Sequence, residues 1–301
     1  MTAQPATLPA VGVWLGLLRA MRPKQWVKNV LVGAAPLAAA SITQPRVALA
    51  TLIAFVAFSL AASAGYLFND VLDVEADRHH PDKQHRPIAS GLVSPRVAVG
   101  AAALLCVTAV ALAALNRSDG LLDVIVVYLA LTTAYSAFLK HERVIDLAVV
   151  AAGFLLRAMA GGLAAGLPLS RWFLLVAAFG ALFLVSGKRY AESLLAGAGS
   201  GRTRRSLAGY SPGYLRFVWS VSAGVTIVAY ALWAFETSSA QAAVPWQQLS
   251  IAPFVIALLR YAVDIDSGRA GAPEQLVLQD RALQALGVIW LVMFSLGAFR
   301  V

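Results

Sequence analysis

The stretch at residues 66–91, YLFNDVLDVEADRHHPDKQHRPIASG, follows directly on a long apolar run and is crowded with acidic side chains. The chain as a whole is 59% hydrophobic and only 13% charged. Carboxylates placed together at the end of an apolar run repel one another and lose solvation. Membrane insertion does not require them, so we expect these acids to bind something.

Further apolar runs along the chain predict a membrane protein, because each is long enough to cross a hydrocarbon core of ~30 Å. Hydropathy predicts nine transmembrane spans, at residues 29–45, 47–68, 97–116, 121–139, 145–166, 171–187, 215–236, 246–262 and 282–300. No linker divides them, so we predict an all-α integral membrane protein with residues 1–301 in a single polytopic domain. Residues 11–22 are too short to span and, with Trp14, Arg19 and Arg22, are typical of a helix lying in the membrane interface.

The basic residues indicate the orientation of these spans. If the nine spans alternate in direction, most of the 24 lysines and arginines fall in connections on one side of the membrane. The positive-inside rule assigns that side to the cytosol. We therefore expect the N-terminus, a metal-site loop at 69–96 and a basic loop at 188–214 on the cytosolic face. Most acidic residues fall there too, which the rule does not require.

The acidic stretch predicts a metal site. On a helix that continues out of the second span, Asn69, Asp70, Asp73 and Asp77 fall within an arc of roughly 100°, whereas Glu75 falls on the far side. Hard oxygen ligands without thiols or clustered imidazoles favour Mg²⁺, which usually shares its coordination shell with substrate phosphates. We expect a magnesium diphosphate here, with Asp73 and Asp77 as catalytic residues.

Two other interpretations of this stretch remain open. The acids could form a solvated helix end that pairs with the basic residues Arg78, Lys83 and Arg86. The histidines His79, His80 and His85 could bind a transition metal, although their spacing fits no common zinc pattern.

The pattern N-D-x-x-D-x-x-x-D followed by R-P-I-A-S-G, with an upstream R-P-K-Q-W-V-K-N, resembles the UbiA-type membrane prenyltransferase superfamily over nearly the whole chain. The resemblance implies a nine-helix bundle whose magnesium-dependent diphosphate site faces the cytosol. Members that use prenyl diphosphates carry a second aspartate-rich motif after the sixth span. Here that place reads SGKRYAE, with Lys188, Arg189, Tyr190 and Glu192, so the resemblance implies a donor that is more anionic than a prenyl diphosphate.

The phrases RPKQWVKNVLV, LLRAMAGG, PLSRWFLL, GKRYAE, YLRFVW and LRYAVD are similar to one bacterial branch of this superfamily. That branch transfers 5-phosphoribosyl from phosphoribosyl pyrophosphate (PRPP) to a polyprenyl phosphate such as decaprenyl phosphate, for cell-wall arabinan (arabinogalactan) precursor synthesis. The resemblance implies a pentosyltransferase in the bacterial plasma membrane with Mg²⁺ as its cofactor. The lipid phosphate would attack C1 from the face opposite the diphosphate, through an oxocarbenium-like transition state, and so invert C1. Because this phosphate is already ionised, no strong general base would be needed.

Basic and tyrosine side chains near the cytosolic face are candidates for binding the donor's two phosphate groups. These are Lys24, Lys28, Arg86, Tyr135, Lys140, Lys188, Arg189 and Tyr190. Arg157 lies in the middle of a span, where a charge must face a cavity or a partner, and we expect it to meet the acceptor phosphate. The alternatives are topology anchors and interfacial belts for the first group, and structural pairing for Arg157.

Other features carry smaller expectations. Gly161, Gly162 and Gly166 are typical of helix packing, and Arg260 and Asp264 are spaced to pair along one helix. A pI near 10 would suit nucleic-acid binding, but no soluble domain could carry it. A prenyltransferase with an aromatic acceptor and a membrane transporter are the alternative functions, and a homo-oligomer is possible.

Overall fold

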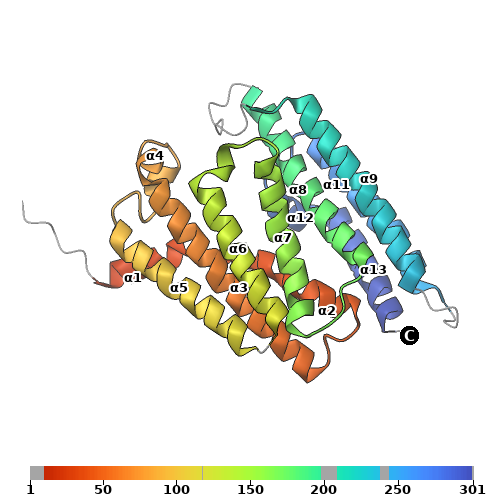
Figure 1. The fold of residues 1–301 in the computed structure, drawn as a ribbon. Coiled ribbons are helices and arrows are strands. Elements are labelled where there is room, and N and C mark those ends of the chain that lie inside the picture. Colours follow the sequence, from red (N-terminus) through yellow and green to blue (C-terminus); the bar gives the residue numbers. More distant parts are fainter. Residues whose placement is uncertain (1–9, 117, 198–208, 238–243, 300–301) are drawn as a thin grey trace, which may run out of the picture.

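The computed structural model describes residues 10–116, 118–197, 209–237 and 244–299, and every regular element within them is a helix (Figure 1). The elements are α1 (Ala10–Ala20), η1 (Pro23–Gly33), α2 (Ala34–Ala38), α3 (Pro45–Leu72), α4 (Val74–Arg78), η2 (Lys83–His85), α5 (Pro95–Leu115), α6 (Asp119–Ala137), η3 (Leu139–His141), α7 (Ile145–Ala164), α8 (Arg171–Gly197), α9 (Pro212–Thr237), α10 (Trp246–Leu249), α11 (Ile251–Asp266), α12 (Pro273–Gln279) and α13 (Arg281–Ala298). The η elements are 3-10 helices.

Eight helices in the described part of the chain are long and apolar enough to cross a membrane. They span Pro45–Leu72, Pro95–Leu115, Gly120–Ala137, Ile145–Ala164, Arg171–Leu195, Pro212–Thr237, Trp246–Asp266 and Arg281–Ala298. The expected all-α membrane architecture is therefore confirmed, and eight of the predicted spans correspond to these helices.

The first predicted span, at 29–45, is not one long α-helix. A 3-10 helix, η1, runs from Pro23 to Gly33 and passes into the short α2. Its inner edge is held by side chains of α3, because Trp26 Nε1 donates to Ser63 Oγ and Asn29 Nδ2 donates to Ser59 Oγ, both at 3.0 Å. A 3-10 run of this length is uncommon, so packing against neighbouring helices must stabilise it.

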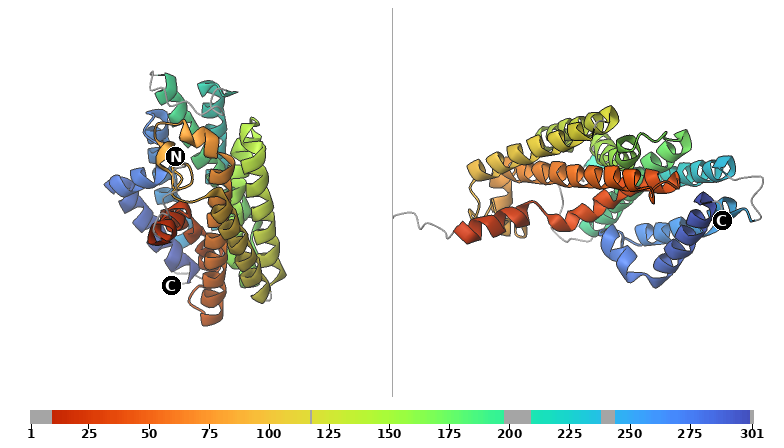
Figure 2. Two further views of the ribbon diagram at one scale, coloured as in Figure 1. Left: turned by 90° about the vertical axis from the view of Figure 1, so that its left-hand side faces the viewer. Right: turned by 90° about the horizontal axis from the view of Figure 1, so that it is seen from below.

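The long helices α3, α5, α6, α7, α8 and α9 lie side by side, and α1, η1 and the α11–α13 segment form a second layer beneath them (Figure 2, right). Alanines on the inner face of α3 allow this close packing, and they include Ala54, Ala57 and Ala61. Small side chains let helix backbones approach closely within a membrane, where apolar burial adds little driving force.

Glycines at the end of α7 show two different roles. A Cβ on Gly161 would lie 1.9 Å from the carbonyl oxygen of Val32, and one on Gly162 would lie 2.9 Å from Ala35 Cβ. The packing role predicted for these two glycines is confirmed, because they let η1 and α2 contact α7. Gly166 was wrongly grouped with them: it has φ +68°, meets nothing within 4 Å, and reverses the chain after α7.

The N-terminal helix α1 covers most of the segment 11–22 that was expected to lie in the membrane interface, and it packs on the loop before α5. Leu17 and Ala20 are buried with Ile88 and Val93, while Trp14 remains 69% exposed. This contact holds the chain that enters η1 close to the loop that follows α4.

The second predicted loop is shorter than the expected range 188–214. Helix α8 continues to Gly197, so Lys188, Arg189 and Tyr190 are helical. The basic run at 202–205 lies outside the described residues. The ends of α3, α6 and α8 and the starts of α7 and α9 lie together at one end of the bundle, at the top of Figure 1.

Candidate functional site

The acidic stretch leaves the bundle through a break between two helices. Helix α3 ends at Leu72, Asp73 adopts φ −92° and ψ 6° as its C-cap, and α4 begins at Val74. The expectation of one continuous helix through Asp77 is therefore wrong. The break turns Asp73 in a different direction from Asp70 and Asp77, so the three carboxylates do not share a simple helical stripe.

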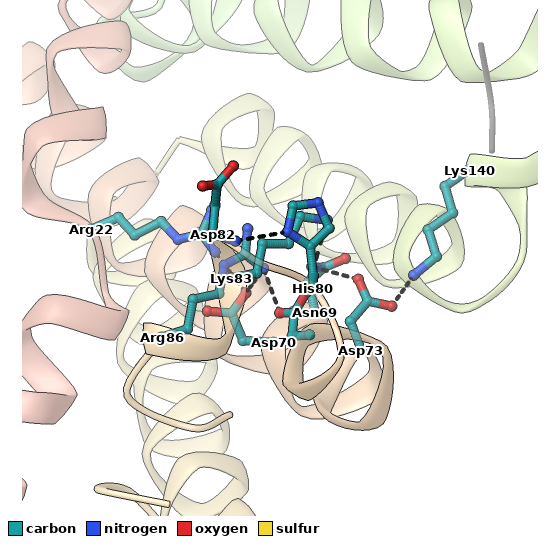
Figure 3. A network of polar contacts seen from close by, with 10 residues as sticks. Arg22, Asn69, Asp70, Asp73, His80, Asp82, Lys83, Arg86 and Lys140 are labelled. Carbon is teal, nitrogen blue, oxygen red and sulfur yellow. Dashed lines mark hydrogen bonds and ion pairs between the residues drawn. The ribbon is translucent and has the colours of Figure 1, made fainter. Parts of the chain in front are cut away.

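Arg86 joins two of these carboxylates (Figure 3). Its Nη1 lies 3.1 Å from Asp70 Oδ1 and 2.6 Å from Asp77 Oδ2. Asp70 and Asp77 are each only 2% exposed. Pro87 disfavours a helical conformation at Arg86, which has φ −63° and ψ 143°, so the chain turns back beside α3. Lys83 Nζ lies 3.8 Å from Asp77 Oδ1 on the same side.

Asp73 points to the opposite side of the cluster, toward Lys140 of η3 (Figure 3). Lys140 Nζ lies 2.5 Å from Asp73 Oδ1, and Asn69 Nδ2 donates to Asp73 Oδ2 at 3.1 Å. Two of the predicted donor-binding side chains, Arg86 and Lys140, thus meet the predicted metal ligands directly.

The four oxygen-bearing residues Asn69, Asp70, Asp73 and Asp77 fit Mg²⁺ in donor chemistry, because all offer hard oxygens. Their arrangement differs from a closed metal site. Within the described ranges, no group of three or more acidic, histidine or cysteine side chains is placed to hold one ion. Each carboxylate is instead neutralised by a basic side chain. An ion would therefore have to replace arginine and lysine contacts at this site.

Arg22 also belongs to this cluster, although sequence reasoning assigned it only to the interfacial helix. Its Nη2 lies 2.6 Å from Asp70 Oδ1, and its guanidinium lies over the Tyr66 ring at 4.9 Å. Arg22 has the left-handed backbone angles φ 54° and ψ 60°, which are uncommon for a residue with a side chain. The available signal was the dipeptide Arg22–Pro23, which repeats the arginine–proline pattern of Arg86–Pro87.

A buried ion pair connects α6, α7 and α8 near this end of the bundle. Arg189 Nη2 lies 3.1 Å from both oxygens of Asp146, and Tyr135 Oη donates to Asp146 Oδ1 at 2.7 Å. Arg189 also contacts Glu192 at 3.3 Å. Asp146 is 1% exposed, so losing either partner would leave a buried charge without its counterion. Tyr135 and Arg189, both predicted donor contacts, thus interact with protein groups.

Tyr190 and Lys188 differ in their surroundings. The Tyr190 hydroxyl accepts a hydrogen bond from Arg216 at 2.6 Å and lies 3.4 Å from Asp266 Oδ1, so this side chain points toward α9 and α11. Lys188 is half-buried and forms no ion pair with any described residue. Of the cations in the GKRYAE segment, Lys188 is therefore the one that remains available to an anion.

Arg157 is buried inside the bundle and is surrounded by neutral groups. Its Nε donates to Asn29 Oδ1 at 2.7 Å, Nη2 donates to the Tyr128 hydroxyl at 2.7 Å and Nη1 donates to the Gly153 carbonyl at 2.8 Å. The guanidinium also lies 4.8 Å from the centre of the Tyr128 ring. No described carboxylate neutralises it. The alternative of structural ion pairing thus has no support among these residues.

The remaining predicted residues lie at the edge of this site. Lys24 is exposed and Lys28 is half-buried on η1, on the helix that also carries Asn29. His79 Nδ1 lies 2.8 Å from the Glu75 carbonyl and His80 Nδ1 accepts from the Asp82 amide at 3.1 Å, so neither approaches the other as a metal ligand would.

A tyrosine from the opposite loop holds the segment that carries Lys140. The Tyr210 hydroxyl accepts a 2.6 Å hydrogen bond from the amide of Val144, which has the unusual φ of 66°. Burial raises the pKa of Tyr210 above its ordinary value, so the phenol is neutral at physiological pH. Because Val144 immediately precedes α7, this contact also fixes the start of the helix that carries Asp146.

Comparisons with known proteins assign the chain to a family. The model of the UbiA prenyltransferase family matches residues 29–283. A decaprenyl-phosphate phosphoribosyltransferase of Corynebacterium glutamicum is 50% identical over 289 residues, which cover 94% of this chain and 87% of the relative. The protein of the same name from Mycobacterium tuberculosis (strain H37Rv) is 49% identical over 295 residues, 97% of both chains.

Solved structures show the same fold at low sequence identity. A UbiA homologue from Archaeoglobus fulgidus bound to DMAPP and Mg²⁺ has a TM-score of 0.70 at 18% identity, covering 94% of this chain and 98% of that chain. A structure of digeranylgeranylglyceryl phosphate synthase has a TM-score of 0.67 at 14% identity, covering 96% and 99%. This multi-pass membrane chain belongs to the UbiA prenyltransferase family, because the family model matches most of its length and relatives share about 50% of its residues.

Proposed function

We propose that this protein is a pentosyltransferase that moves 5-phosphoribosyl from PRPP to a polyprenyl phosphate, with decaprenyl phosphate as the acceptor. The named relatives at about 50% identity support this assignment, since they cover nearly the full chain. The product would serve cell-wall arabinan synthesis, as the resemblance of the sequence implies.

The observation that carries the proposal is the alternation of acids and bases at the end of the bundle. Asp70, Asp73 and Asp77 each contact a cation, and those cations come from three separate segments of the chain. A magnesium diphosphate presents both charges, so the acids would bind the metal while the released arginine and lysine groups bind phosphate oxygens. A donor with a diphosphate and a separate phosphate suits this excess of basic groups.

Asn69, Asp70, Asp73 and Asp77 would hold Mg²⁺, with Asp73 and Asp77 closest to the chemistry. When bound, the ion supplies charge that stabilises the diphosphate as a leaving group. Arg86, Arg22 and Lys140 would turn from the carboxylates onto the same diphosphate. Departure of the diphosphate from C1 would generate an oxocarbenium-like centre, which the lipid phosphate attacks from the opposite face with inversion.

The other predicted cations would divide between the two substrates. Lys188 is the best candidate for the donor's 5-phosphate, because it lacks a carboxylate partner among the described residues. Lys24 and Lys28 would add phosphate contacts from η1. Arg157 would attract the phosphate of the polyprenyl acceptor, since its buried charge is met only by neutral groups within the described structure. Tyr135, Arg189 and Tyr190 would hold these helices in place.

We also propose nine membrane crossings, with η1 and α2 as the first. A 3-10 helix rises about 2.0 Å per residue, so η1 followed by α2 covers roughly 30 Å, about the thickness of a hydrocarbon core. Nine crossings place the end that carries Asp70 and Lys140 in the cytosol of a bacterial cell, where the positive-inside rule puts the basic connections.

The test is an assay of purified protein with radiolabelled PRPP and polyprenyl phosphates, with and without EDTA. We expect label to enter the lipid fraction only with Mg²⁺ present. Parallel incubation with DMAPP and an aromatic acceptor tests the prenyltransferase alternative, and flux assays in vesicles test a transporter. Product from DMAPP alone, or flux without any lipid product, would contradict the proposal.

A further inference from the structure

A polar cavity of about 730 Å³ lies apart from the acidic cluster, between α11, α12 and α13. Its charged lining consists of Arg260, Asp264, Arg269, Asp280 and Arg281. Among the described side chains, three guanidinium groups thus face two carboxylates, which leaves one positive charge in excess. None of these residues belongs to the proposed PRPP site.

The two carboxylates are already fully engaged. Arg260 forms a bidentate pair with Asp280, with Nε–Oδ2 at 2.8 Å and Nη2–Oδ1 at 3.0 Å, and Arg269 Nη2 lies 2.6 Å from Asp264 Oδ1. The predicted Arg260–Asp264 pair is therefore wrong, because α12 folds back and brings Asp280 to Arg260. Arg281 forms no ion pair with any side chain that the structure describes, so its charge is not neutralised by Asp264 or Asp280.

The cavity lies at the height where lipid headgroups are expected. Helix α13 has 18 residues and rises about 1.5 Å per residue, so its length roughly matches a hydrocarbon core. Arg281 begins this helix and therefore falls at its membrane boundary. Figure 2 (right) shows the α11–α13 segment in the second layer, beneath the long helices.

Exposed apolar side chains lie on the same helices as this charged cavity. Leu259 and Val263 flank Arg260 along α11 and are 55% and 62% exposed, and Leu278 of α12 is 75% exposed. Side chains of this kind are exposed to acyl chains in a membrane-spanning bundle. A guanidinium cluster directly beside an acyl-facing surface matches an amphiphile with an anionic head, and basic pockets between membrane helices bind such heads.

We infer that the cavity between α11, α12 and α13 binds the phosphate headgroup of a membrane lipid, with Arg281 as its main contact and Arg260 and Arg269 beside it. The carboxylates of Asp264 and Asp280 keep the two paired arginines oriented toward the cavity. This site is separate from PRPP transfer, and its lipid would fasten the α11–α12–α13 segment against the bundle. The two candidate occupants, a phospholipid and a polyprenyl phosphate, both carry a phosphate group on a long apolar chain.

The experiment measures the melting temperature of detergent-purified full-length protein with added phosphatidylglycerol, phosphatidylcholine, polyprenyl phosphate or inorganic phosphate. We expect phosphatidylglycerol to raise the Tm of the wild type and phosphatidylcholine to leave it nearly unchanged. Arg281→Gln should weaken the apparent affinity about tenfold, as the loss of one charge-assisted contact implies. High salt should weaken the wild-type response.

Arg96→Gln is the matched control, because Arg96 is also exposed, also lies in the first turn of a membrane-spanning helix and is outside the cavity. Arg96→Gln should show the same Tm shift with phosphatidylglycerol as the wild type. Arg281→Lys, which keeps a positive charge, should show a larger shift than Arg281→Gln. An Arg281-dependent shift with polyprenyl phosphate supports the site equally and identifies that lipid as an occupant. Equal responses of Arg281→Gln and the wild type, or an equal shift from inorganic phosphate alone, would overturn the inference.

Discussion

Lys140 Nζ lies 2.5 Å from Asp73 Oδ1, although 67 residues separate the two in the chain. This ion pair connects the break after α3 to the loop between α6 and α7. Asp73 is a predicted metal ligand and Lys140 is predicted to bind a donor phosphate. The ion pair therefore joins the metal-binding and phosphate-binding parts of the proposed donor site.

Replacing Asp73 tests the metal assignment. Asp73→Asn keeps the size of the side chain but removes the charge, and we expect kcat for phosphoribosyl transfer to fall by about 100-fold or more. Glu75→Gln is the matched control, because Glu75 is exposed and pairs with Arg78 outside the cluster. Steady-state assays across a range of Mg²⁺ concentrations measure both variants. Similar losses in the two would argue against a metal-binding role for Asp73.

Arg22 separates backbone strain from chemistry. Arg22→Ala and Arg22→Gly both remove the guanidinium from Asp70, so both should lower kcat/KM for PRPP to a similar extent. Glycine adopts the left-handed angles of this position without strain, and we expect Arg22→Gly to be more stable than Arg22→Ala by about 1 kcal/mol. Thermal unfolding in detergent compares the two. A full recovery of activity in the glycine variant would mean that the guanidinium is dispensable.

Arg157 tests the acceptor assignment. Arg157→Lys retains a positive charge but loses the planar set of bonds to Asn29 and Tyr128, and we expect KM for polyprenyl phosphate to rise about tenfold or more while KM for PRPP changes little. Tyr128→Phe removes one of these hydrogen bonds and keeps the ring, so it should have a smaller effect. If KM for PRPP rises instead, Arg157 belongs to the donor site.

Asp280 predicts a pH dependence of stability. The hydrogen bond from Arg260, together with the amides at the start of α13, lowers the pKa of Asp280 in the folded protein. The ionised carboxylate adds to the free energy of unfolding. This gain is fully present above the unfolded pKa of about 3.9 and is lost as the pH falls through the lower folded pKa. Asp280→Asn should therefore lower the Tm at neutral pH. As the pH is lowered, the Tm of this variant should fall less steeply than that of the wild type. If the Tm of the two proteins fell in parallel at acid pH, Asp280 would not contribute to the pH dependence of stability.

Gly161 tests the close contact between η1 and α7. A Cβ at this position would overlap the Val32 carbonyl, so Gly161→Ala should destabilise the protein by about 3 kcal/mol, since helix backbones must separate. Gly100→Ala in α5 is the control: its Cβ would meet nothing within 4 Å, and we expect a neutral or slightly stabilising effect. Melting temperatures in the same detergent compare them. Equal shifts would contradict the packing at Gly161.

Hydropathy located most of the spans, because each apolar helix must match the bilayer with its own residues. It was less successful at 29–45, where the helix is 3-10 and begins earlier, at Pro23. Hydrogen-bond spacing within a short helix depends on what packs against it. Here Ser59 and Ser63 on α3 accept hydrogen bonds from side chains of η1, and Gly161 on α7 lets its backbone approach, and no local sequence pattern reports these contacts.

The acidic residues could be recognised from the sequence, whereas their partners could not. Arg22 and Arg86 both contact Asp70 across 48 and 16 residues. Similarly, Arg189 was expected to contact the donor but is buried against Asp146, 43 residues away. Sequence spacing shows which faces of one helix coincide, and it carries no information on which distant side chain completes an ion pair.

The amino-acid sequence by itself determined that the chain is a helical membrane protein and that a group of carboxylates, with basic side chains close by in the chain, follows its second apolar run. These are local properties, set by hydrophobicity and helical period. The tertiary structure alone decided that Arg86 joins Asp70 to Asp77, that Lys140 meets Asp73 and that Arg281 is left without a counterion among the described residues. The physical reason is that ion pairs form at short range, and only packing of the helices brings distant charges within that range.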